Sequence, residues 1–89
     1  MSHKLETVTE HLNLPGELLE RVPRLTMTGN RRLLVENRGE LLSYSQECVE
    51  LGCAGLHLRI CGEALLLDMM DRDALIVTGH IASVEAERV

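Results

Sequence analysis

The sequence has almost no aromatic side chains. It contains no Phe and no Trp, and Tyr44 is its only aromatic residue. Proteins that bind single-stranded nucleic acid stack the bases on aromatic side chains, and this chain offers no such platform. The core must be aliphatic, and a chain of 89 residues buries only about 60–65% of the surface that it exposes when unfolded.

Basic charge is also scarce. The chain has nine Lys and Arg residues against fourteen Asp and Glu residues, which gives a formal net charge of −5. Nucleic-acid binding depends on a basic surface that neutralises phosphates. Adsorption to anionic lipid depends on clustered Lys and Arg. The composition therefore argues against both kinds of partner.

Long apolar runs are absent as well. No stretch of the sequence approaches the roughly 18–20 apolar residues that span a bilayer, and residues 1–6 have no apolar signal core. The three cysteines are an odd number, which fits a reducing compartment better than a disulfide framework. We therefore expect a cytoplasmic protein that does not insert directly into a membrane.

The N-terminal part of the chain has a helical pattern. Apolar residues at spacings of three and four predict an amphipathic helix over 4–13, and Pro15 suits the first turn of a second short helix. The apolar stripe of the first helix consists of Leu5, Val8 and Leu12. This stripe could lie on a membrane surface, but its Glu-rich polar face favours packing on a sheet.

From Leu25 onward the apolar period changes to two, which is typical of strands. The clearest strand segments are 25–27, 33–35, 56–60, 64–69 and 74–78, and weaker ones are 41–45 and 49–51. Turn signals separate them at Gly29-Asn30, Arg38-Gly39, Gly52–Gly55, Gly62-Glu63 and Asp71–Asp73. Gly79 indicates a bulge before 81–84.

These patterns predict one domain over residues 1–89, with a helical segment at 1–23 and a β region at 24–87. The fold class is mainly β. We expect a small antiparallel β meander of about six or seven short strands, preceded by one or two short helices. The meander could form a sandwich, a barrel or a solenoid-like stack.

Two strand segments carry more apolar residues than one buried face needs. Leu65-Leu66-Leu67 and Leu75-Ile76-Val77 are apolar at consecutive positions, so both of their faces require cover. By contrast, 56–60 alternates strictly, which predicts that Leu56, Leu58 and Ile60 are buried while His57 and Arg59 face solvent or a partner. Leu66 and Ile76 are therefore the candidate interaction surface.

No pattern in the sequence assigns a catalytic residue, a cofactor-binding residue or a metal ligand, and we expect no enzyme and no cofactor. The cysteines lack the Cys-x-x-Cys spacing of zinc and redox sites, although they could still converge with a histidine. The candidates weighed for a metal site were Cys48, Cys53, Cys61 and His57. Those weighed for other chemistry were His80, Asp68, Asp71, Asp73, Ser43, Ser45 and Ser83. The aspartates lack the Gly and distal Glu of a calcium loop, and the serines lack a nucleophile elbow.

The order of several short elements resembles the YabP/YqfC family of bacterial sporulation proteins. The matching elements are Leu14-Pro15, Pro23–Asn30, Leu33–Asn37, Arg38-Gly39, Leu58–Gly62 and Ile76–Ile81. The resemblance implies a protein made in the mother cell during endospore formation. It also implies work beside a membrane-associated sporulation partner, and no enzymatic activity.

The sequence leaves three hypotheses for function. The first is a non-enzymatic structural or assembly module of sporulation, acting by protein–protein contact through a sheet edge or an apolar face. It includes self-association into a homo-oligomer. The second is a β module that encloses a small apolar ligand. The third is a Cys/His metal-binding protein.

Overall fold

The structure is a computed structural model that describes residues 22–89. In this range the chain forms six β-strands and no helix. The strands are β1 (Arg24–Thr28), β2 (Arg32–Glu36), β3 (Glu40–Tyr44), β4 (Cys48–Cys53), β5 (Leu56–Met70) and β6 (Ala74–Arg88). The predicted helical segment over 1–23 lies outside the described residues except for Val22 and Pro23, which are not helical.

All six strands belong to one antiparallel sheet with the order β1-β2-β6-β5-β4-β3. Four consecutive strands, β3 to β6, form a meander, and β1 pairs with β2 as a hairpin. The prediction of a meander throughout is wrong at one junction, because β2 pairs with β6 and not with β3. The pairing of β2 with β6 joins segments far apart in the sequence, so no local sequence pattern predicts it.

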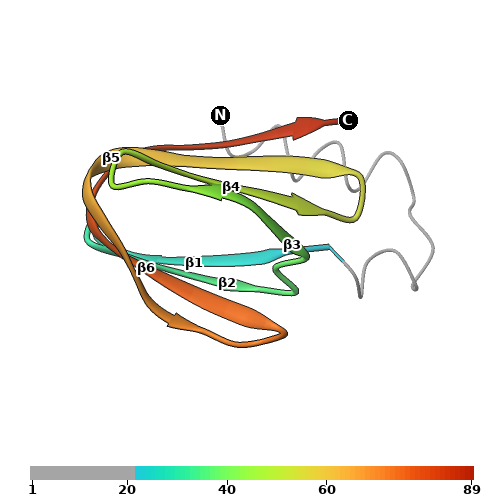
Figure 1. The fold of residues 1–89 in the computed structure, drawn as a ribbon, viewed down its shortest axis with the longest axis horizontal. Helices are drawn as coiled ribbons and strands as arrows, with labels where there is room; N and C mark the ends of the chain where they lie inside the picture. The colour runs from blue at the N-terminus through green and yellow to red at the C-terminus, as the bar shows by residue number, and fades with distance from the viewer. Residues whose placement is uncertain (1–21) are drawn as a thin grey trace.

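The sheet is folded over into two layers. Figure 1 shows β4 in one layer and β1 and β2 in the other, while β5 and β6 run from one layer into the other. The sheet is open, since β1 and β3 are its two edges. Among the three architectures expected, the open sheet excludes the closed barrel.

Strands β5 and β6 are longer than expected, with 15 residues each. Gly62-Glu63 was predicted to be a turn between two strands, but both residues lie inside β5. The register of β5 against β6 shifts here, between Cys61 and Gly62 and again between Glu63 and Leu66. The glycine therefore bends a continuous strand.

The bend requires glycine at two positions. A Cβ atom at Gly62 would collide with the carbonyl oxygen of His80 on the partner strand. Gly79 has φ +128°, and a Cβ there would lie 2.5 Å from the carbonyl oxygen of Ala64. The irregularity predicted at Gly79 is thus present, and it is shared by both long strands.

Two hairpin loops complete the hydrogen bonding at the bend. The β3–β4 loop accepts bonds from β5, with Gly62 N donating to Glu47 O at 2.9 Å and Leu65 N donating to Gln46 O at 2.8 Å. The β1–β2 loop accepts bonds from Gly79 N and Ile81 N of β6 at 3.2 and 2.8 Å. Backbone groups that leave the strand ladder at the bend are thereby paired.

The core lies between the two layers and is aliphatic, as the composition predicted. It contains one side of β2, β4, β5 and β6. Its buried residues are Leu33, Val35, Val49, Leu51, Cys53, Leu58, Ile60, Leu65, Leu75, Val77 and Ile81. No polar or charged residue in the described range is buried with them. Leu58 and Ile60 are buried as predicted, whereas Leu56 at the start of β5 is only half-buried.

Candidate interaction surface

Four apolar side chains gather on the outer face of the layer that contains β1 and β2. Directly opposed residues of antiparallel strands point to the same face, and Ile76 is opposite Leu34 on β2 and Met69 on β5. Since Leu75 and Val77 are fully buried, Ile76 between them points outward. Leu34, Ile76 and Met69 therefore form a row across three adjacent strands.

Leu66 extends this row along β5. It lies opposite Thr78, which is two residues from Ile76 and shares its face. We call Leu34, Leu66, Met69 and Ile76 the outer apolar patch. Leu66 is 56% exposed, and Leu34 and Ile76 are half-buried. The structure thus brings the two sequence-predicted residues, Leu66 and Ile76, together on one surface.

Leu34 and Met69 were not predicted from the sequence to belong to the candidate interaction surface. Leu34 lies in the middle of the three-residue apolar run Leu33-Leu34-Val35, which is the same signal that marked Leu66 and Ile76, so this run could have predicted it. Its register opposite Ile76 places it on the same surface. Register depends on the non-local pairing of β2 with β6, which the sequence does not reveal.

The outer face of the other layer is polar. Two cross-strand rows define this outer polar face, Glu50–Arg59–Glu85 and Gly52–His57–Glu87. His57 Nε2 lies 2.8 Å from Glu50 Oε1, and Ser43 Oγ donates to Glu50 Oε2 at 3.2 Å. His57 was expected to face solvent or a partner. It is half-buried and tied to a neighbouring carboxylate, while Arg59 is exposed.

The three cysteines do not converge with His57. Cys53 is buried in the core, and its Sγ donates to the carbonyl oxygen of Arg38 at 2.7 Å. Burial raises the pKa of the Cys53 thiol above its usual value. Cys48 and Cys61 instead lie directly opposite each other on β4 and β5, with 2.7 Å between their sulfur atoms.

The remaining candidates are dispersed. His80 and Asp68 are exposed at separate points, and Ser45 Oγ accepts from Glu47 N and Cys48 N in a tight turn. Within residues 22–89, no three His, Cys, Asp or Glu side chains come together as metal ligands.

The polar connection between β5 and β6 is organised by Asp71 and Arg38. Asp71 Oδ1 accepts from Asp73 N at 2.9 Å and from Ala74 N at 2.8 Å. These two hydrogen bonds hold the pKa of the Asp71 carboxyl below its ordinary value, and the charge of Arg38 acts in the same direction. Arg38 Nε donates to Asp71 O at 2.6 Å. This contact ties the β2–β3 connection to the β5–β6 loop.

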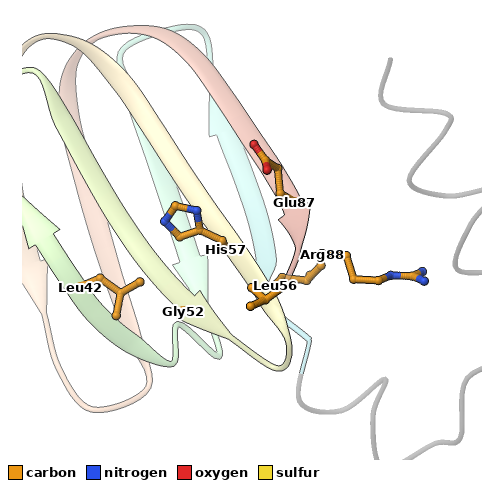
Figure 2. Close-up of a pocket in the computed structure, with 7 residues that line it drawn as sticks. Leu42, Gly52, Leu56, His57, Glu87 and Arg88 are labelled. Atoms are coloured by element: carbon orange, nitrogen blue, oxygen red, sulfur yellow. The ribbon is translucent and has the colours of Figure 1, made fainter.

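A hollow of about 360 Å³ opens at the end of the outer polar face. Its lining comes from four adjacent strands, with Leu42 on β3, Gly52 on β4, His57 on β5 and Glu87 on β6. Figure 2 shows Leu42 and His57 over this surface, with Arg88 extending away from it. The hollow lies outside the sheet, whereas the space between the layers is filled by the core. It does not resemble the enclosed interior that the ligand hypothesis requires.

In the described part of the chain, no helix has the length and apolar character that crossing a bilayer requires.

Comparison with protein families gives one result. A family model described as the YabP family matches residues 19–88, which is most of the chain and includes all six strands. Comparison with curated proteins gave no match, and comparison with solved structures gave none either.

Proposed function

The chain belongs to the YabP family, and on that premise we propose that it is a non-enzymatic sporulation module acting by protein–protein contact. Family membership indicates a sporulation-related protein. We further propose that it acts in the cytoplasm of the mother cell during endospore formation. Its partner would be a membrane-associated sporulation protein that keeps it at the periphery of a membrane.

The observation that supports this proposal is the difference between the two outer faces. One face carries charged and hydrogen-bonded side chains, as solvent-facing sheets do. The other carries Leu34, Leu66, Met69 and Ile76 side by side. Small soluble domains seldom leave several large apolar side chains contiguous on a sheet face unless a partner covers them.

The rim of the outer apolar patch suits a protein partner. Arg32 is exposed and shares the face of Leu34, two residues along β2. Arg24 and Glu36 lie opposite each other on the same side, with 3.9 Å between Arg24 Nε and Glu36 Oε2. An apolar centre with a charged rim is the usual anatomy of a protein interface.

The test is recovery of the partner from sporulating cells with the tagged full chain. Leu66→Lys places a charge within the patch, where burial without a partner charge costs several kcal/mol. We expect this variant to lose the partner and the sporulation function. Ser83→Lys is the matched control, because it adds the same charge at an exposed position on the opposite outer face.

Both variants should keep the circular dichroism spectrum and melting temperature of the native protein. If Leu66→Lys recovers the same partner as Ser83→Lys and supports sporulation equally, contact through this patch is excluded.

A further inference from the structure

Cys48 and Cys61 form the closest pair of reactive side chains on the outer polar face. They are directly opposed in the β4–β5 ladder. Val49 and Ile60, their neighbours in sequence, are fully buried, so alternation directs both cysteines outward. Both residues are half-buried, which leaves the sulfur atoms within reach of a small solute.

The strand pairing supplies the geometry that a disulfide needs. A disulfide has Cα atoms about 4.4–6.8 Å apart and an S–S bond of about 2.05 Å. Directly opposed residues of antiparallel strands have Cα atoms about 4.5–5.5 Å apart, inside that window. The sulfur atoms are already 2.7 Å apart, so small rotations of two side chains close the remaining distance.

The surroundings separate this pair from the third cysteine. Arg59, two residues before Cys61, forms a hydrogen bond with the Cys48 side chain, and this bond raises the Arg59 pKa. The hydrogen bond with Cys48 raises the pKa of Cys61. Cys53 is buried and bonded to Arg38 O.

We propose that Cys48 and Cys61 form a reversible dithiol–disulfide couple that a hydroperoxide oxidises. In the first step the thiolate of Cys48 attacks one peroxide oxygen, the O–O bond breaks, and a sulfenic acid forms. The other oxygen leaves as hydroxide, which takes up the proton that the Cys48 thiol lost and becomes the first water. In the second step the sulfur of Cys61 displaces the sulfenic oxygen as water and loses its proton. Overall, two thiols and one hydrogen peroxide give one disulfide and two waters. The cysteines lose two electrons and the peroxide gains them.

A disulfide between Cys48 and Cys61 would restrict motion at the bend of the sheet. Cys48 follows the β3–β4 loop, whose Gln46 and Glu47 carbonyl groups accept from Leu65 N and Gly62 N. Tyr44, at the end of β3, donates its hydroxyl to Leu65 O at 3.0 Å. A covalent link from Cys48 to Cys61 would hold this loop against β5 at the point where β5 passes between layers. Oxidation state would then set the rigidity of the β3–β4 hairpin.

The experiment uses the purified full chain, fully reduced, with hydrogen peroxide at one equivalent. We expect the intact mass to fall by two hydrogen atoms and a Cys48–Cys61 linked peptide to appear after digestion without reductant. Dithiothreitol should reverse the change. The oxidised protein should melt higher by roughly 5 °C or more, since the bond closes a loop of the unfolded chain.

Three cysteine variants identify which sulfur atoms form the disulfide. Cys53→Ala should still form the bond. Cys61→Ser should instead accumulate a sulfenic acid on Cys48 that a dimedone probe traps, and Cys48→Ser should form neither the bond nor the sulfenic acid. A linked peptide that contains Cys53, a disulfide between two chains, or oxygen addition without a linked peptide in the native protein would overturn the proposal. The wild-type peptide map decides this even if a variant fails to fold.

Discussion

Single residues in this protein take their roles from the alternation of each strand. In β5, Leu58 and Ile60 are fully buried while Arg59 between them is exposed. Leu56 departs from the pattern because it begins the strand at the end of the sheet, where fewer side chains cover it. Burial of one residue therefore depends on two conditions, its face and its distance from the end of its strand.

Leu58 provides a test of this burial pattern through the free energy of unfolding. Leu58→Ala should lower the free energy of unfolding by about 2–4 kcal/mol, because it removes a fully buried side chain and leaves a cavity. Denaturant titration measures the loss. Leu66→Ala is the control, since Leu66 is 56% exposed. A loss at Leu58 below about 0.5 kcal/mol, the range of ordinary surface substitutions, would show that the strand is misplaced.

The Asp71 carboxylate makes the stability of the fold depend on pH in the acid range. Its folded-state pKa is lowered by hydrogen bonds from Asp73 N and Ala74 N. A lowered folded pKa means that the carboxylate stabilises the fold at neutral pH. This contribution is fully present above the ordinary Asp pKa of about 3.9 and is lost as pH falls through the folded pKa.

The substitution Asp71→Asn removes the carboxylate charge but keeps a side-chain oxygen that can accept hydrogen bonds. We expect the variant to be less stable than the native protein at pH 7, and the difference to shrink as the pH falls below the ordinary Asp range. Urea titrations across this pH range would measure it. A stability difference that stays constant with pH would contradict the role of the carboxylate.

At the scale of elements, the long strands β5 and β6 depend on the bend at Gly62 and Gly79. Gly62→Ala should destabilise the fold by roughly 1–3 kcal/mol, the usual cost of overpacking, since the added Cβ meets the His80 carbonyl group. Thermal or denaturant unfolding measures this. In contrast, Gly52→Ala adds a Cβ in ordinary contact with the Leu42 side chain at 3.5 Å. Equal losses at both glycines would argue against the bend as the cause.

The elements also show how far the sequence could predict the fold. Period-two patterns located the strands around Leu25, Leu33 and Leu58, because alternation is a local property. They split β5 and β6, because a glycine that bends a strand and a glycine that ends one give the same signal. The Ala54-Gly55 turn was predicted two residues too wide, since Gly52 and Cys53 still pair in β4.

The candidate site was predictable in part, for the same reason. Consecutive apolar residues marked Leu66 and Ile76. The same signal was present at Leu34, whereas Met69 and the pairing of Cys48 with Cys61 depend on register between strands. Register is set by pairing across the whole sheet, so it became visible only in the fold.

At the scale of the molecule, residues 22–89 form one outer face that is mainly polar and one that carries the outer apolar patch. We therefore expect the purified chain to self-associate where no other partner covers the outer apolar patch. Sedimentation over a range of concentrations should show association in the native protein and a monomer for Leu66→Lys. Ser83→Lys should sediment like the native protein. A native protein that stays monomeric at high concentration would restrict the patch to a different partner.

The continuity of β5 and β6 through both layers also has a kinetic consequence. Only Asp71–Asp73 separate the two strands, so their hairpin closes a short loop and can form early, before the non-local pairing of β2 with β6. Opening that hairpin separates β1, β2 and β6 from β3, β4 and β5, and neither group of three strands can cover the core that lies between the layers. Unfolding of the sheet should therefore occur in a single cooperative transition, without a populated intermediate in which one layer survives the other.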